Sequence, residues 1–270
     1  MTIVPSGKIL VTGANGYLAA WVVRRFLEKG YSVRGTVRSE KKAVHLNKTF
    51  AHYKEKYETV VVEDITKEGA FDKAVIGVDG IAHTASPFHF KADDPAEIIR
   101  PAVDGTLGIL KSALNISSVR RIVVTSSTAA IISFHSERKV FTELDWNEQS
   151  LEEVQQQGKN ANQGAKYRAS KTLAERAAWE FYNANKAKIS WDLVTLNPPF
   201  IFGPVISDIS SPSALGTSAG DWYNSVVRPD SGGKSLEVLA TIGGGWVDVR
   251  DISLAHVLAL QKAEAGENGC

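Results

Sequence analysis

Short apolar runs alternate with longer amphipathic stretches along this chain. The apolar runs predict strands at Lys8–Thr12, Ser32–Val37, Thr59–Val62, Gly80–Ala85, Arg121–Ser126 and Trp191–Leu196. Helical periodicity follows the first run through Leu27, and it predicts further helices at Lys41–Lys56, Lys67–Val75, Ala96–Leu114, Gly164–Asn185 and Ile252–Ala265. Parallel strands need such crossover connections, so the pattern predicts an α/β fold with a doubly wound parallel sheet.

Two other stretches are polar or rich in small residues, and we expect loops there. They are Glu152–Gln163 and Ser207–Gly220. In a parallel α/β sheet, ligands gather where the strands end at their carboxyl ends. We therefore look for candidate chemistry at those ends.

The first strand runs into a glycine-containing turn, Gly13-Ala-Asn-Gly16. Gly13 permits a sharp turn, Gly16 lets the backbone approach a ligand, and Ala19 lets the next helix pack closely. The free N–H groups at the start of that helix would face a pyrophosphate. The alternative is a purely structural turn between a strand and a helix. We place the cofactor against Gly13, Asn15, Gly16, Tyr17 and Leu18.

The ends of the second and third strands suggest which dinucleotide binds. Arg38 and Lys42 stand where an NAD-binding protein usually carries an acid, so they favour the 2′-phosphate of NADPH. Their alternative role is that of ordinary solvated charges. Asp64 and Ile65 could contact the adenine, although Asp64 could equally cap the following turn.

Candidate catalytic groups lie at later strand ends and on the long helix. Tyr167 and Lys171 are four residues apart, so they share one helix face, and the ammonium is expected to lower the tyrosine pKa. Ser127 could hold a substrate carbonyl, with Ser126 and Thr128 as substitutes, or it could cap the next loop. His83 is expected to be a packed, hydrogen-bonded residue rather than a catalyst.

Composition narrows the classes of function. The formal net charge is +1, which provides no general attraction to nucleic acid or to a membrane surface. The single cysteine, Cys270, cannot form a disulfide within the chain. We see neither a secretory leader nor an apolar run near the ~20 residues of a membrane span. We expect a cytoplasmic protein without a metal site, either a monomer or a homodimer.

Taken together, the motifs give the chain a family resemblance. It resembles the extended short-chain dehydrogenases/reductases, in the branch of fungal NADPH-dependent aldehyde and ketone reductases that is related to plant dihydroflavonol reductases. The resemblance covers essentially the whole chain, and its motifs are Val11–Gly16, Thr36–Arg38, His83–Pro87, Pro101–Thr106, Val124–Ser127, Tyr167 with Lys171, Asn197–Pro204 and Trp246–Asp251.

The resemblance implies an NADPH-dependent reduction of a small-molecule aldehyde or ketone. Ser127, Tyr167 and Lys171 would be catalytic, with Tyr167 as the proton donor. The implied cofactor contacts are Arg38 and Lys42 with the 2′-phosphate, Asp64 and Ile65 with adenine, Thr84 and Ala85 with the middle of the cofactor, Pro198 and Ile201 with the nicotinamide, and Ser218 as a further contact. Residues 1–196 would form the Rossmann-type NADP-binding domain with the catalytic helix. Residues 197–270 would form the substrate lobe, with a late segment returning to the main sheet.

Substrate choice is expected to come from less typical segments. Five aromatic residues could line an apolar pocket, namely Phe88, Phe90, Phe134, Phe200 and Trp222, although such a residue by itself more often belongs to the core than to a pocket. Family members usually continue several tens of residues beyond the point that matches Cys270. We therefore expect a truncated product whose substrate lobe exposes apolar surface.

Two other functions stay open at this level. An epimerase or dehydratase of the same superfamily would use tightly held NAD, against which Arg38 argues. A non-catalytic NADPH-binding sensor would not need Ser127, Tyr167 and Lys171 together.

Overall fold

A computed structural model describes residues 3–86, 92–227, 234–241 and 244–266, and its centre is a six-stranded parallel sheet. The strands are β1 Lys8–Thr12, β2 Ser32–Val37, β3 Tyr57–Val61, β4 Gly80–His83, β5 Arg121–Thr125 and β6 Asp192–Leu196. Their order is β3-β2-β1-β4-β5-β6, which confirms the predicted doubly wound fold. The order reverses between β1 and β4, where such sheets open a crevice for ligands.

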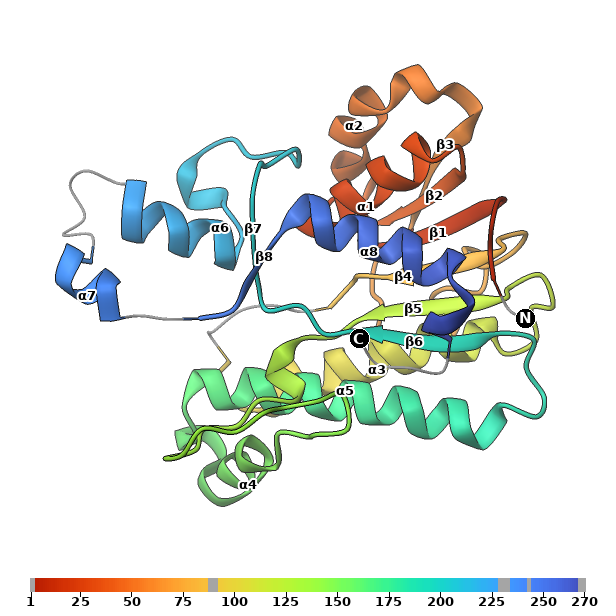
Figure 1. Ribbon diagram of the computed structural model, residues 1–270. Coiled ribbons are helices and arrows are strands. Elements are labelled where there is room, and N and C mark those ends of the chain that lie inside the picture. Colours follow the sequence, from red (N-terminus) through yellow and green to blue (C-terminus); the bar gives the residue numbers. More distant parts are fainter. Residues whose placement is uncertain (1–2, 87–91, 228–233, 242–243, 267–270) are drawn as a thin grey trace.

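Helices cover both faces of this sheet (Figure 1). They are α1 Tyr17–Glu28, α2 Glu40–Thr49, α3 Ala96–Ala113, α5 Gln163–Asn185 and α8 Val249–Gln261. A further helix, α4 Glu148–Gln157, packs on the outside of α5. On one face, α1, α2 and α8 bury an apolar core that includes Val23, Phe26 and Leu260. On the other face, α3 and α5 enclose a second core that includes Ile109 and Tyr182. The sheet is thus apolar on both sides, as a buried parallel sheet must be.

A smaller layer lies beyond the end of β6 (Figure 1). It contains a pair of parallel strands, β7 Phe200–Phe202 and β8 Trp246–Asp248, and two short helices, α6 Thr217–Trp222 and α7 Leu236–Thr241. The helix α8 follows β8 directly and returns the chain to the main sheet. Within the described residues, no helix combines the length and the apolar character needed to cross a bilayer.

The structure corrects two predicted helices. Residues 67–75 form hydrogen-bonded turns instead of a helix, because Gly69 has a φ of 70° and interrupts the helical run. The helix expected over Lys41–Lys56 ends at Thr49, and a 3-10 segment, Ala51–Lys56, follows it. Inside that segment Lys54 has a φ of 51°, so a single helix cannot continue through it.

Both predicted loops contain helices. Much of Glu152–Gln163 belongs to α4, whose first turn is capped by Asn147 through the N–H of Ser150 (3.0 Å). The polar composition reflects a surface helix that packs against α5 with one side only. Ser207–Gly220 includes a 3-10 turn, Pro212–Ala214, and the start of α6. A stretch of small residues therefore did not exclude helical turns.

A buried ion pair joins the central sheet to the last helix. The guanidinium of Arg121, which is 1% exposed, donates to both carboxylate oxygens of Asp192 (2.7 and 2.8 Å). It also donates to the carbonyl oxygens of Ala259 (2.6 Å) and Lys262. These carbonyls lie at the C-terminal end of α8, where unsatisfied backbone acceptors gather. One side chain therefore holds β5, β6 and α8 together.

Asp192→Ala is expected to lower the free energy of unfolding by about 3–5 kcal/mol, because it leaves the buried guanidinium without its counter-ion. Urea denaturation monitored by circular dichroism measures this. The matched control is Glu28→Ala, which breaks the exposed pairs of Glu28 with Arg24 and Arg25 and should cost less than about 1 kcal/mol. Equal losses of unfolding free energy in the two variants would show that the buried ion pair stabilises the fold no more than the exposed pairs do.

Candidate active site

The glycine turn after β1 is shaped by close packing. Gly13 has a φ of 65°, and a Cβ there would lie 3.1 Å from the Cβ of Ala85. The N–H of Gly16 donates to the carbonyl of Gly13 (2.9 Å), and α1 starts directly after Gly16 without a side-chain cap. Uncapped N–H groups at a helix start suit an anion such as a pyrophosphate. Asn15 lies within this turn.

Thr12, which was not predicted as a site residue, positions backbone groups at the base of the crevice between β1 and β4. The hydroxyl of Thr12 accepts the N–H groups of Thr84 and Ala85 (both 3.1 Å). It also contacts Nδ1 of His83 (2.9 Å), and the hydroxyl of Thr84 donates to the carbonyl of Thr12. These bonds fix the end of β4 against the end of β1. His83 is buried and hydrogen-bonded, as predicted, and burial lowers its pKa to about 3.

The residues predicted for the adenosine part of the cofactor lie at the ends of β2 and β3. The side chains of Arg38 and Lys42 are exposed. One carboxylate oxygen of Asp64 accepts the N–H (2.9 Å) and the hydroxyl (2.7 Å) of Thr66, which is the turn-capping role left open above. Those bonds lower the pKa of Asp64, and the nearby charge of Arg38 contributes. Ile65 packs against the helical residue Gly105, where a Cβ would lie 2.8 Å from it.

The predicted catalytic hydroxyls meet above the end of β5. The phenol of Tyr167 is hydrogen-bonded to Ser127. Ser127 also accepts the N–H of Ala129 (3.1 Å) and donates to the carbonyl of Pro198 (3.4 Å), so it caps the following 3-10 turn at the same time. Ser126 is buried and bonded to Glu175, and Thr128 begins the 3-10 turn. Of the three hydroxyls, the structure brings Ser127 to Tyr167.

Burial sets the protonation of the pair on α5, and it corrects the expected tyrosine pKa. Burial raises the pKa of Tyr167 to about 12, and its hydrogen bond to Ser127 only partly opposes this. The expected lowering of the Tyr167 pKa is therefore wrong, because burial destabilises the phenolate more than its neighbours stabilise it. Burial also lowers the pKa of Lys171 to about 8, against the opposing charge of Glu175. The ammonium donates to the hydroxyl of Ser86 (3.1 Å).

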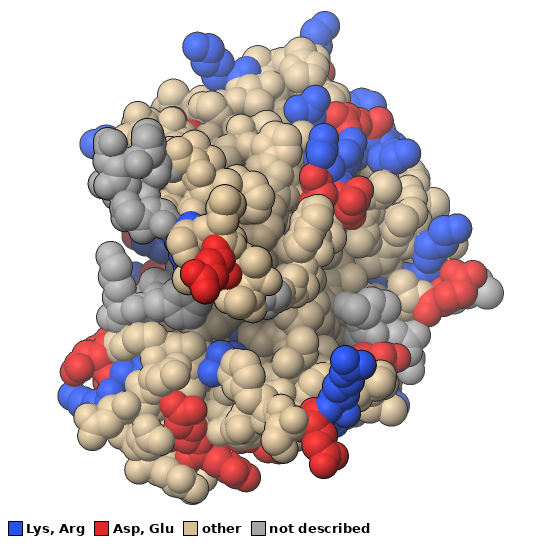
Figure 2. Space-filling view, turned by 60° about the vertical axis from the view of Figure 1, so that its left-hand side comes forward, with Lys and Arg blue, Asp and Glu red and all other residues tan. Residues whose placement is uncertain are grey.

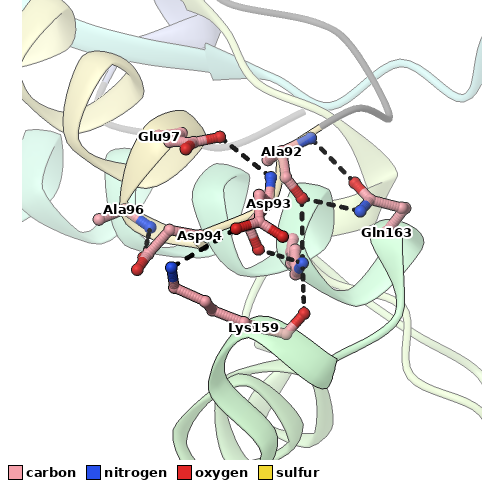
Figure 3. A network of polar contacts seen from close by, with 8 residues as sticks. Ala92, Asp93, Asp94, Ala96, Glu97, Lys159 and Gln163 are labelled. Carbon is pink, nitrogen blue, oxygen red and sulfur yellow. Dashed lines mark hydrogen bonds and ion pairs between the residues drawn. The ribbon is translucent and has the colours of Figure 1, made fainter.

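A second network fixes the first turn of α5 (Figure 3). The buried ammonium of Lys166 donates to the carbonyl oxygens of Ala92 (3.0 Å), Asp93 (2.6 Å) and Lys159 (2.8 Å). The amide of Gln163 pairs with both backbone groups of Ala92 (3.1 and 2.7 Å). These bonds join three chain segments directly beside Tyr167, so the catalytic helix has a fixed start.

Three side chains join the smaller layer to helices α1 and α2. Tyr17 donates to the carbonyl of Gly203 (2.9 Å), and the indole of Trp21 donates to that of Pro204 (2.8 Å). His45 bonds the carbonyl of Ile206 through Nε2 (3.0 Å). We call these three contacts the strap. The predicted cofactor residue Tyr17 thus has its hydroxyl in the strap.

The remaining predicted cofactor residues are less closely grouped. Pro198 is buried next to Ser127, while Leu18 and Ile201 pack against the core shared by α1 and α8. Ser218 lies on α6, and α6 and α5 are well separated in Figure 1. The contact of Ser218 with the cofactor stays a prediction.

The aromatic residues expected around one pocket are not gathered. A cavity of about 610 Å³ lies between β7, β8 and α6, and its lining includes Phe202, Trp222 and Trp246. Phe200 stacks on Phe202, but Phe134 is exposed under the guanidinium of Arg168 (4.9 Å to the ring centroid). Phe88 and Phe90 lie outside the described residues. The face that comes forward in Figure 2 is hollowed, with mostly uncharged side chains around the hollow.

Several positions of the site were missed by sequence reasoning, namely Thr12, Ser86, Lys166, Glu175 and Asn197. Only some of them carry a signal in the sequence. Glu175 continues the four-residue spacing of Tyr167 and Lys171, and Thr12 directly precedes the glycine turn. The described residues contain no cluster of three or more His, Cys, Asp or Glu side chains suited to a metal ion.

Comparison with known proteins places these features in a family. The model of the NAD dependent epimerase/dehydratase family matches residues 9–269. The ketoreductase azaE of Aspergillus niger is 37% identical over 265 residues, which cover 95% of this chain and 75% of the relative. Aldehyde reductase 2 of Sporidiobolus salmonicolor is 37% identical over 262 residues, 94% of this chain and 73% of the relative.

Solved structures agree with the sequence comparison. The crystal structure of yeast methylglyoxal/isovaleraldehyde reductase complexed with NADPH superposes with a TM-score of 0.82 at 32% identity. The match covers 97% of this chain and 76% of the yeast chain. The chain thus spans about three quarters of the length of these relatives.

Thr12→Val is expected to lower the free energy of unfolding by about 1–3 kcal/mol, because the N–H groups of Thr84 and Ala85 lose their acceptor. Thr195→Val is the matched control, since its buried hydroxyl has no hydrogen-bond partner among the described residues. Chemical denaturation of both variants gives the comparison. A control loss as large as that of Thr12→Val would contradict the role of the Thr12 hydroxyl.

Proposed function

The chain belongs to the NAD dependent epimerase/dehydratase family, and on that basis we propose that it is an NADPH-dependent oxidoreductase that reduces an aldehyde or ketone to an alcohol. The relatives reported above carry reductase names, and the yeast structure holds NADPH. The observation that supports the reaction most directly is the hydrogen bond between Tyr167 and Ser127, with Lys171 one turn further along α5.

The crevice has the features that a phosphorylated dinucleotide requires. The uncapped start of α1 and the glycine turn suit its pyrophosphate, while the exposed side chains of Arg38 and Lys42 suit its 2′-phosphate. Asp64, Ile65, Thr84 and Ala85 are proposed to contact the adenosine and the middle of the cofactor, and Pro198 and Ile201 the nicotinamide. When bound, NADPH supplies the hydride.

The polar groups above β5 would bind and protonate the carbonyl oxygen of the substrate. Ser127 would donate a hydrogen bond that orients and polarises this oxygen. Tyr167 would transfer its phenolic proton to the oxygen as the alcohol forms. Because the pKa of Tyr167 is about 12, the group is a phenol at neutral pH and can serve as an acid. The resulting phenolate would be stabilised by the ammonium of Lys171.

The substrate is proposed to be a small carbonyl compound with an apolar substituent. The cavity of about 610 Å³ beside β7 and α6 falls in the size range of ligand pockets, roughly 300–1,000 Å³. Its lining in the described residues does not include Ser127, Tyr167 or Lys171. The cavity supports an apolar substituent on the substrate.

Tyr167→Phe is expected to lower kcat by about 100- to 10,000-fold, because the variant lacks the proton donor while the cofactor crevice is unchanged. Turnover is followed by the loss of NADPH absorbance with a panel of aldehydes and ketones, and cofactor affinity by fluorescence titration. Tyr53→Phe, on the opposite side of the sheet, controls for loss of a phenol. A near-normal rate for Tyr167→Phe would remove the proton-donor assignment, and a wild-type protein that binds NADPH but reduces no carbonyl would overturn the enzyme itself.

Arg38→Asp is expected to lower the preference for NADPH over NADH at least about ten-fold, because an acid at this position repels the 2′-phosphate. The measurement is the ratio of kcat/KM for the two cofactors. Lys29→Asp introduces the same charge change at the far end of α1 and should leave the ratio unchanged. If Arg38→Asp also leaves it unchanged, Arg38 does not bind the phosphate.

A further inference from the structure

A third polar side chain continues the catalytic stripe of α5. Tyr167, Lys171 and Glu175 follow one another at intervals of four residues, so they lie on one face of the helix. Glu175 is only 4% exposed. A buried carboxylate is costly unless its surroundings compensate it, so its presence calls for a physical reason.

The carboxylate of Glu175 binds the ends of two strands. Its Oε2 atom accepts hydrogen bonds from the hydroxyl of Ser126 and from the amide of Asn197 (2.7 Å). The same amide of Asn197 donates to the carbonyl of Ser127 (3.2 Å). Glu175 therefore holds the ends of β5 and β6 against α5, directly beside the hydroxyl that contacts Tyr167.

Glu175 and Lys171 also line one small internal cavity, together with His83, Thr106 and Ser126. In the described part of the chain, the titratable groups that line this cavity beside Lys171 are His83 from β4 and Glu175 from α5, while Thr106 from α3 does not titrate. Tyr167 stands one turn before Lys171 on the same helix.

The hydroxyl oxygen of Thr12 accepts hydrogen bonds from two N–H groups, so its own proton is donated to Nδ1 of His83. The ring proton of the neutral His83 is then on Nε2. Burial lowers the pKa of His83 to about 3 and raises that of Tyr167 to about 12, so both groups are neutral near pH 7. Glu175 provides the negative charge.

We propose that Glu175 is a positioning residue for the reaction, whose negative charge keeps the buried side chain of Lys171 in its ammonium form. This inference rests on the proposed function. A carboxylate is not needed for the hydrogen bonds, because one amide oxygen of a glutamine can accept from both Ser126 and Asn197. The property that glutamine lacks is the charge.

The sign of the effect follows from the electrostatics of Lys171. Burial lowers its pKa to about 8, and the charge of Glu175 acts in the opposite direction. Without that charge the pKa falls further, and the ammonium is lost at a lower pH. The phenolate that forms on Tyr167 then lacks its stabilising cation, so turnover declines at a lower pH than in the wild type.

Glu175→Gln is therefore expected to move the alkaline limb of the kcat profile to lower pH by about one unit or more, the usual effect of an opposite charge nearby. Glu175→Asp keeps the charge and should keep the limb within about half a unit of the wild type. Glu180→Gln removes an exposed carboxylate from the same helix and should leave the profile unchanged.

A second readout does not depend on activity. The pKa of Lys171 is measured by NMR titration of its labelled side chain, assigned with Lys171→Met, in the wild type and in the three variants. A lower Lys171 pKa in Glu175→Gln alone supports the inference, whereas equal values in wild type and Glu175→Gln overturn it. If Glu175→Gln does not fold, Glu175→Met, which removes the charge and keeps a similar volume, is titrated instead. A lower Lys171 pKa in that variant supports the inference, and an unchanged value overturns it. Lack of turnover by the wild type would refute the proposed function and leave this titration decisive for Glu175.

Discussion

The hydroxyl of Thr12 is the contact on which the geometry of the crevice depends. It joins the ends of β1 and β4, the two strands between which the sheet reverses its order. Ala85, held by this hydroxyl, lies so close to Gly13 that a Cβ there would meet the Cβ of Ala85 at 3.1 Å, and the φ of 65° at Gly13 further disfavours a side chain. The position of the glycine turn, the end of β4 and the hydrogen bond from Lys171 to Ser86 therefore depend on the same few backbone positions. A shift at Thr12 would be transmitted to each of them.

Burial away from water governs the protonation of Tyr167 and Lys171 on α5. It favours the neutral form of both Tyr167 and Lys171, since it raises the pKa of the first and lowers that of the second. The two groups would stay neutral over a wide range of pH without further charges. The carboxylate of Glu175 counters this tendency at Lys171, which explains how a buried acid can serve the site although it costs desolvation energy.

Much of the fold was predictable from the sequence, because strands buried on both faces give continuous apolar runs. All six strands of the main sheet were expected, and α1, α3, α5 and α8 were located within a few residues. The segment 67–75 was mistaken for a helix because periodicity does not register the backbone angle of Gly69. Helix α4 was missed because its polar surface resembles a loop and its cap at Asn147 lies outside the segment considered.

The candidate site was predictable only in part, for a related physical reason. Motifs identify candidate ligand-binding groups, such as Ser127 and Tyr167, but they carry no information on burial. The direction of the Tyr167 pKa shift depends on burial, so it could not be predicted correctly. Contacts between distant segments, such as Lys166 with Ala92 and Asn197 with Glu175, also have no local pattern.

The strap has a consequence for how the two parts of the molecule communicate. Tyr17 and Trp21 belong to α1 and His45 to α2, and all three hold backbone carbonyls of the segment 203–206. A compound that orders α1 and α2 on binding also favours the state in which segment 203–206 is bonded to them. Conversely, a compound that stabilises the bonded state of segment 203–206 strengthens binding of the first compound by the same free energy. Filling of the nucleotide crevice and ordering of the smaller layer are therefore expected to be cooperative, with no requirement that the two bound molecules touch.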